Sequence, residues 1–131
     1  MISADDLRNI AFERLADAET LLLARRFDSS FYLCGYSIEI ALKHKICKTL
    51  NWAGFPSSSK EFEKLRSLRT HDLELLLSLT GFESELKIRY FDEWSLVSNW
   101  TPESRYNVTG LVSEAKANEM FTCTSIILLN L

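Results

Sequence analysis

Four side chains of the segment 27–46 have the residue types and the spacing to form a functional surface. Tyr32, Tyr36, Glu39 and Lys43 are separated by four, three and four positions, which places them on one face of a helix. Glu39 interrupts the apolar run YSIEIAL, where a carboxylate is costly unless it is paired or hydrogen-bonded. Its partner could be Lys43, one turn on, or a more distant Arg or Tyr. We interpret Glu39 as part of a buried polar network; a direct catalytic carboxylate is the alternative.

A second candidate region is the Arg105–Tyr106 pair, which follows Pro102 and precedes the last predicted helix. An arginine suits bidentate recognition of phosphate or carboxylate, and a tyrosine can stack on a base or donate a hydrogen bond. Alternatively, Arg105 pairs with Glu39 or another acid and locks the helices together. The two interpretations are compatible, because a structural arginine can border a cleft.

The sequence contains no phosphate-binding glycine loop, dinucleotide fingerprint, zinc-protease motif or hydrolase nucleophile motif. Cys34, Cys47 and Cys123 are widely spaced and form no CxxC pair, so we interpret them as reduced thiols in or near the core. The three tryptophans are interpreted as core or interface aromatics. We therefore predict no metal and no cofactor.

Apolar residues that recur every three or four positions predict the helices that must position these side chains. The predicted helices run over about 4–25, 29–50, 71–81, 84–100 and 110–131, with a loop over 51–59 and a short helical piece over 59–67. The chain has few glycines and prolines, which favours long helices over many short strands. The fold class predicted is all-α: one domain over 1–131, an antiparallel bundle of four to five helices around one core.

The ends of these helices also carry signals. Ser3 is the expected N-cap of the first helix, and Asp28 or Ser29 that of the second. The link between them, around 26–28, is short, so the two helices should form an antiparallel hairpin. The apolar face of the last helix is expected to include Ala115, Met120, Cys123, Ile127 and Leu131.

The formal net charge is -3, so the molecule as a whole is not a general binder of polyanions. The segments 43–48 and 64–71 are nevertheless basic and could form a local basic patch. No apolar run approaches the length of a membrane span, and the N-terminus has no basic stretch followed by an apolar one. We expect a cytoplasmic protein that does not bind membranes.

Three segments together resemble one known family. The stretch AFERLADAETLL at 11–22 runs into FDSSFYLCGYSIEIALKHKI at 27–46, THDLELLL follows at 70–77, and WTPESRY lies at 100–106. In this order the segments resemble the HEPN superfamily of small helical domains. The resemblance implies a homodimeric bundle of about five helices that acts on or near RNA or nucleotides. Tyr36, Lys43, Arg105 and Tyr106 are then candidate nucleotide- or RNA-binding residues.

The resemblance also draws attention to Arg66 and His71. HEPN ribonucleases have an arginine followed, four to six residues on, by a histidine, and Arg66-Ser-Leu-Arg-Thr-His71 has this spacing. In such a pair the histidine serves acid–base chemistry and the arginine steadies phosphate charge. The family usually has the motif in its last long helices, where this chain has Arg105 but no histidine. We therefore favour a helix-start role for His71, supported by Asp72.

Three functional hypotheses follow. The first is a HEPN-type homodimeric module that acts with a nucleotidyltransferase-like or defence/toxin–antitoxin partner, as in phage defence, and binds nucleotide or RNA. The second is a metal-independent ribonuclease toxin that uses Arg66 and His71, assisted by Arg105 or Tyr106. The third is a non-catalytic interaction scaffold.

Overall fold

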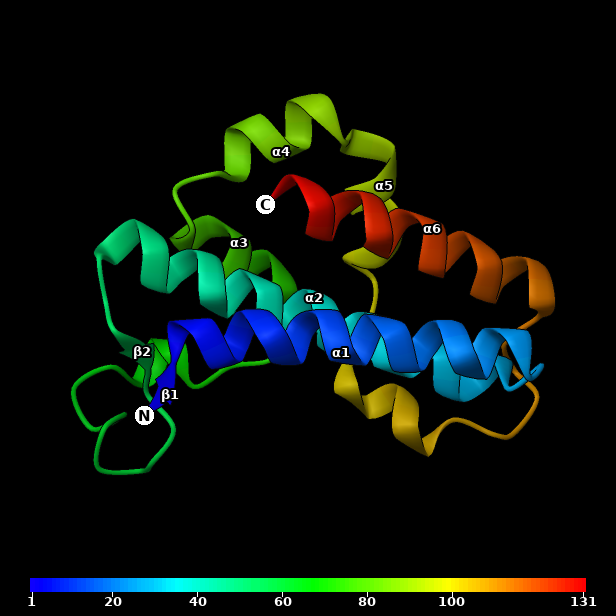
Figure 1. Cartoon of the computed structure of the whole chain (residues 1–131), viewed down its shortest axis with the longest axis horizontal. Coiled ribbons are helices and arrows are strands. Elements are labelled where there is room, and N and C mark those ends of the chain that lie inside the picture. Colours follow the sequence, from blue (N-terminus) through cyan, green and yellow to red (C-terminus); the bar gives the residue numbers. More distant parts are fainter.

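The computed structural model describes all residues, 1–131. It contains six α-helices, two short 3-10 helices and one two-stranded sheet (Figure 1). The elements in chain order are β1 (Ile2–Ser3), α1 (Ala4–Leu23), α2 (Phe27–Leu50), β2 (Gly54–Phe55), η1 (Arg66–Leu68), α3 (Leu73–Leu79), α4 (Glu83–Arg89), α5 (Phe91–Val97), η2 (Pro102–Tyr106) and α6 (Glu114–Asn130). The prediction of an all-α fold class is confirmed. No helix is both long and apolar enough to span a bilayer.

Helices α1 and α2 form the antiparallel hairpin that the sequence predicts, and they lie side by side along the molecule (Figure 1). Small residues of α1 face buried serines of α2. The Ser30 hydroxyl donates to the Ala18 carbonyl and the Ser37 hydroxyl to the Ala11 carbonyl, both at 2.7 Å. Because these hydroxyls are fully buried and satisfied, they set the register of the hairpin as well as its close approach.

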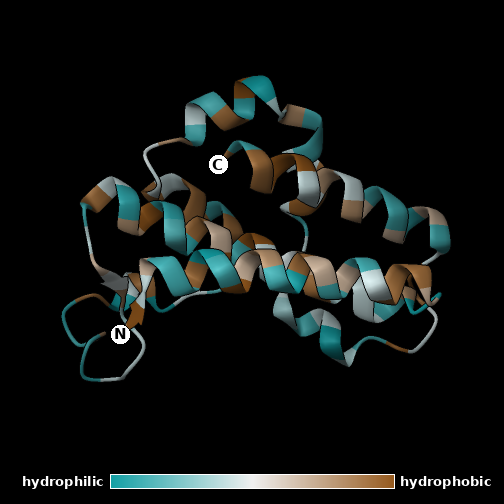
Figure 2. Cartoon of the chain, viewed as in Figure 1, coloured by the Kyte–Doolittle hydropathy of each residue, from teal (hydrophilic) through white to brown (hydrophobic).

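The core surrounds α2 and lies between this helix and α1, α3, α5 and α6. The apolar spacing in the sequence predicts a buried stripe on α2 that consists of Phe31, Cys34, Ile38, Leu42 and Ile46. The last four are fully buried, whereas Phe31 is half-buried and packs against the core. Figure 2 shows polar and apolar residues alternating along α1 and α2, as expected for helices with one covered face. Of the tryptophans, Trp94 and Trp100 are buried in this core, and Trp52 packs against it half-buried.

The prediction for the last helix is wrong at one position, since Ala115 is exposed and Ala117 is buried. Ser113 caps α6 by accepting the N–H of Lys116, so the helix begins later than predicted. The exposure of Ala115 has another reason, the helical repeat: Ala117 lies about one turn before the buried Met120, whereas Ala115 lies too far back to share that face.

The predicted helix over 84–100 is two short helices instead of one. Tyr90 joins α4 to α5 with φ -129° and ψ 43°, a conformation that breaks the helix. The break turns the chain so that Leu86 and Trp94 are both buried. Trp94 Nε1 also donates to Glu74 Oε1 of α3 at 2.7 Å, and this tertiary bond compensates for the lost helical continuity.

Of the two N-caps predicted from the sequence, one is confirmed and one is wrong. Ser3 accepts the N–H of Asp6 at the start of α1, as predicted. The N-cap position of α2 is Arg26, which makes no side-chain cap, so the prediction of Asp28 or Ser29 is wrong. Asp28 instead accepts two backbone N–H groups of the segment that precedes α6. The predicted helical piece over 59–67 consists of turns that lead into η1.

Candidate functional site

Glu39 is the most buried ionisable side chain of the α2 face, with its side chain only 4% exposed. Both of its oxygens have partners. Lys43 Nζ lies 3.3 Å from Oε2, and His71 Nδ1 lies 2.7 Å from Oε1. The predicted polar network around Glu39 is therefore present. Its local member, Lys43, was one of the partners proposed from the sequence, whereas the histidine comes from 32 positions further along the chain.

His71 joins this network just before α3. A carboxylate can only accept, so the hydrogen on His71 lies on Nδ1 and the neutral ring keeps Nε2 as its acceptor. The side chain is 59% exposed, in contrast to its carboxylate partner. The helix-start interpretation is half right, because Asp72 and not His71 caps α3 by accepting the N–H of Leu75. A buried carboxylate that orients an exposed imidazole is an arrangement suited to acid–base chemistry.

Arg66 lies in η1, exposed, and makes no side-chain hydrogen bond or ion pair. No hydrogen bond or ion pair joins it to His71, although only four residues separate them in the sequence. Neither residue lines any of the four main pockets of the molecule. The structure thus brings His71 to Glu39 and leaves Arg66 outside this cluster.

Towards the start of α2 the same helix face is aromatic. The Tyr32 and Tyr36 rings meet edge to face, with centroids 5.0 Å apart, and Tyr36 meets the buried Trp100 in the same way at 5.2 Å. Gly35 makes this possible, because a Cβ there would lie 2.0 Å from the Trp100 ring. The contact with the Tyr32 hydroxyl, together with burial and the nearby Glu39 charge, raises the pKa of Tyr36 to about 12.

Arg105 completes this aromatic end from η2. Its guanidinium lies 4.8 Å from the centre of the Tyr106 ring, and interactions with Tyr106 and Tyr32 raise its pKa. No ion pair of the structure includes Arg105, so the alternative in which it pairs with Glu39 or another acid is wrong. The physical reason is that Glu39 is already satisfied by Lys43 and His71.

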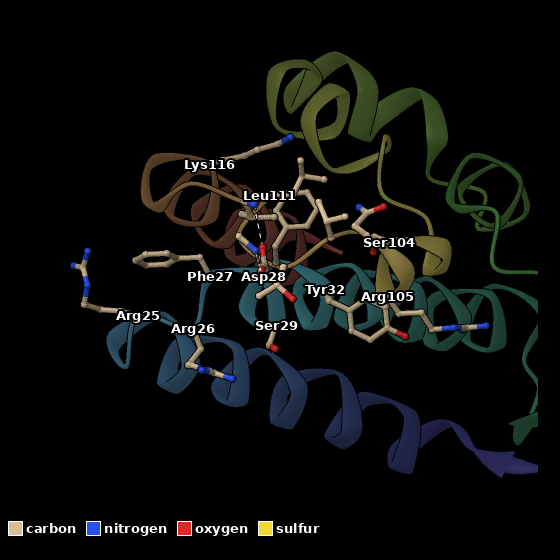
Figure 3. A pocket seen from close by; sticks show the side chains of 16 residues that line it. Arg25, Arg26, Phe27, Asp28, Ser29, Tyr32, Ser104, Arg105, Leu111 and Lys116 are labelled. Atoms are coloured by element: carbon tan, nitrogen blue, oxygen red, sulfur yellow. Dashed lines mark hydrogen bonds between the residues drawn. The ribbon is translucent and has the colours of Figure 1, made fainter.

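A cavity that the sequence analysis missed adjoins Arg105. It has a volume of about 570 Å³ and lies between the α1–α2 turn, the start of α2 and the segment from η2 to α6 (Figure 3). Four basic side chains line it: Arg25, Arg26, Arg105 and Lys116. The sequence signal was the consecutive arginines 25 and 26 at the predicted link, but Lys116 is too distant in sequence for any local pattern to add it.

No family model, curated protein or solved structure matches this chain. No group of three or more His, Cys, Asp or Glu side chains is placed to hold a metal ion. The three cysteines are free, and burial raises the pKa of Cys34 to about 12, which keeps that thiol protonated. The ionisable groups on the α2 face are phenols, the Glu39 carboxylate with its bound imidazole, and cations.

Proposed function

We propose that this chain is a HEPN-type helical module that binds a nucleotide or RNA. It acts as a homodimer beside a nucleotidyltransferase-like or other defence or toxin–antitoxin partner. The observation that supports this most directly is Arg105, a guanidinium with no carboxylate partner, in contact with Tyr106 and Tyr32. Tyr32 lies on α2, and Tyr36 and Lys43 follow it along the same face of that helix. The sequence analysis predicts both of them as binding residues.

This combination of groups suits a nucleotide. A guanidinium offers a planar fork of donors to phosphate oxygens, and it is available here because no acid competes for it. Tyr106 is 75% exposed, so its ring is accessible to a base. A purely structural Arg105 would be expected to have a carboxylate partner, and it has none.

Binding to a fluorescently labelled single-stranded RNA and to ATP tests the proposal. We expect the double variant Arg105→Gln, Tyr106→Ala to bind about tenfold more weakly or worse, because it loses a charge-assisted hydrogen bond and a stacking contact. Arg89→Gln is the matched control, since Arg89 is an exposed arginine of α4 without side-chain partners. No binding by the wild type, or equal binding by both variants, would contradict the proposal.

Homodimerisation and partnership need separate measurements. Sedimentation of the purified protein should give the mass of a dimer, and the chain should copurify with a nucleotidyltransferase-like protein encoded beside it. A monomer that has no partner and no nucleotide affinity would leave the non-catalytic scaffold as the function.

The Glu39–His71 hydrogen bond favours a second candidate, the metal-independent endoribonuclease. In this reaction Nε2 of His71 takes the proton of a ribose 2′-hydroxyl, and the 2′-oxygen attacks the neighbouring phosphorus. The bond to the 5′-oxygen breaks, and a 2′,3′-cyclic phosphate remains. The 5′-oxygen takes a proton from water, and His71 releases to water the proton that it accepted, so the ring is neutral again. Glu39 would hold the imidazole in the required tautomer, and Arg66 or Arg105 would steady the phosphate charge.

Incubation with total RNA in the presence of a chelator tests this second function. Cleavage by the wild type should fall at least a hundredfold in His71→Ala, in line with the loss of a general base. Arg66→Gln tests the arginine of the sequence motif independently of His71. If this variant cleaves RNA as fast as the wild type, a residue other than Arg66 stabilises the phosphate charge. If the wild type and His71→Ala cleave equally, or neither cleaves, His71 is not catalytic.

A further inference from the structure

The basic cavity beside Arg105 has cations that the rest of the protein does not neutralise. Of the four, only Arg25 has an acidic partner, Glu114, with 3.3 Å between Nη2 and Oε2. Lys116 Nζ lies 5.7 Å from the centre of the Phe31 ring, and the Arg26 side chain has no hydrogen bond or ion pair. In a chain of net charge -3 this is a local concentration of unpaired positive charge.

The one acid that lines the cavity is engaged elsewhere. Asp28 accepts the N–H of Gly110 through Oδ2 at 2.6 Å and the N–H of Val112 through Oδ1 at 2.9 Å. These hydrogen bonds lower its pKa, and Figure 3 shows the carboxylate held against the segment that precedes α6. Since both oxygens bind backbone N–H groups, Asp28 anchors this segment and forms no ion pair with the cations around it.

Two buried polar atoms beside the cavity have no partner in the protein. Ser104 lines the cavity and also an adjoining pocket of about 360 Å³, which Trp100 lines as well. Ser104 Oγ and Trp100 Nε1 are both buried without a hydrogen bond, and Trp100 is only 3% exposed. A buried donor of this kind is normally satisfied, so a ligand that accepts from it would supply the missing bond.

We propose that these two joined pockets bind the phosphate group of a nucleotide, either free or at the end of an RNA chain. In the cavity, Arg26, Arg105 and Lys116 approach from different sides and supply the positive potential that attracts the phosphate (Figure 3). The adjoining pocket takes the nucleoside, which accepts from Ser104 or Trp100. Phe31 and Lys116 line both pockets and so connect the two parts of the ligand. The volumes fall within the range of small-molecule sites. That the phosphate belongs to a nucleotide rests on the proposed function; the phosphate site itself rests on the cations.

Calorimetric titrations with four probes test the site: inorganic pyrophosphate, ATP, and a short single-stranded RNA with either a 5′-phosphate or a 5′-hydroxyl. The test variant combines Arg26→Gln and Lys116→Gln. Its control combines Lys60→Gln and Lys64→Gln, which removes the same two charges from exposed positions outside the cavity. All four residues are exposed, so both variants should fold.

We expect the test variant to bind pyrophosphate and ATP at least tenfold more weakly than the wild type, and the control to stay within about twofold. A preference for the 5′-phosphorylated RNA over the 5′-hydroxyl form would identify an RNA end as the source of the phosphate; a preference for ATP would identify the free nucleotide.

Equal losses in both variants would overturn the site, because bulk charge alone would explain the binding. Wild-type RNA binding that neither variant changes would overturn the site and leave the proposed function intact. Cavity-dependent binding of pyrophosphate without any binding of ATP or RNA would support the phosphate site and contradict the proposed function.

Discussion

The two ends of the α2 face differ in whether their charged side chains have partners of opposite charge. At one end the Glu39 carboxylate is buried, and Lys43 and His71 satisfy both of its oxygens. At the other end Arg105 and Lys116 are exposed beside a cavity and have no acidic partner. Burial explains the difference, because a buried charge must be paired whereas an exposed one can remain free. The paired end is organised to hold an imidazole in one orientation, and the unpaired end to receive an anion.

The largest effect is expected where the two ends meet, at Gly35. A Cβ at this position would lie 2.0 Å from the Trp100 ring, which supports Tyr36. Gly35→Ala should therefore lower the free energy of unfolding by about 3 kcal/mol through overpacking. Urea denaturation measures it, with Gly110→Ala as a control that meets no atom but has a positive φ of 86°. A Gly35→Ala variant no less stable than the control would show that Trp100 is not seated on α2.

Glu39→Gln tests the paired end. The amide keeps the shape but removes the charge that faces Lys43 and His71, so we expect a loss of about 2 kcal/mol in the free energy of unfolding. Glu83→Gln is the matched control, because the Glu83–Lys87 pair is exposed and should contribute much less to stability. Similar losses in the two variants would show that the buried pair stabilises the fold no more than the exposed one.

Asp28→Asn tests the anchor of the unpaired end. The hydrogen bonds from Gly110 and Val112 lower the Asp28 pKa, so its contribution to stability is present above the unfolded pKa and is lost as the pH falls through the folded one. The variant should be less stable by about 1 kcal/mol above pH ~5, and the difference should shrink below pH ~4. Urea denaturation across this range measures it. A constant difference, or one also seen for the exposed Glu63→Gln, would count against the anchor.

The smallest effect is expected for Tyr36→Phe. The pKa of Tyr36 is raised to about 12, so its phenol should ionise only at strongly alkaline pH. Because the folded pKa lies above the unfolded value of about 10, its stabilising contribution is present below pH ~10 and is lost as the pH rises towards 12. Ultraviolet titration of phenolate should lose its most alkaline step in Tyr36→Phe and keep it in Tyr106→Phe. An unchanged titration in Tyr36→Phe would assign that step to another residue.

Local sequence patterns were sufficient for the hairpin and its buried faces. The apolar spacing of α2 places Cys34 to Ile46 in the core, and Ser3 caps α1. Both depend on the helical repeat and on neighbours within a few residues, which a sequence displays directly. The break at Tyr90 was not predicted, because apolar spacing of three and four continues through it and only the packing of α5 against α6 decides where the chain turns.

For the candidate site, the sequence by itself determined which side chains share the α2 face and that Glu39 needs a partner. Only the tertiary structure decided that this partner is His71 as well as Lys43, and that Arg105 contacts tyrosines instead of an acid. The cavity lined by both Arg26 and Lys116 also forms only in the tertiary structure. The physical reason is distance along the chain: helical periodicity relates residues three or four apart, whereas these pairs meet only once the whole core has packed.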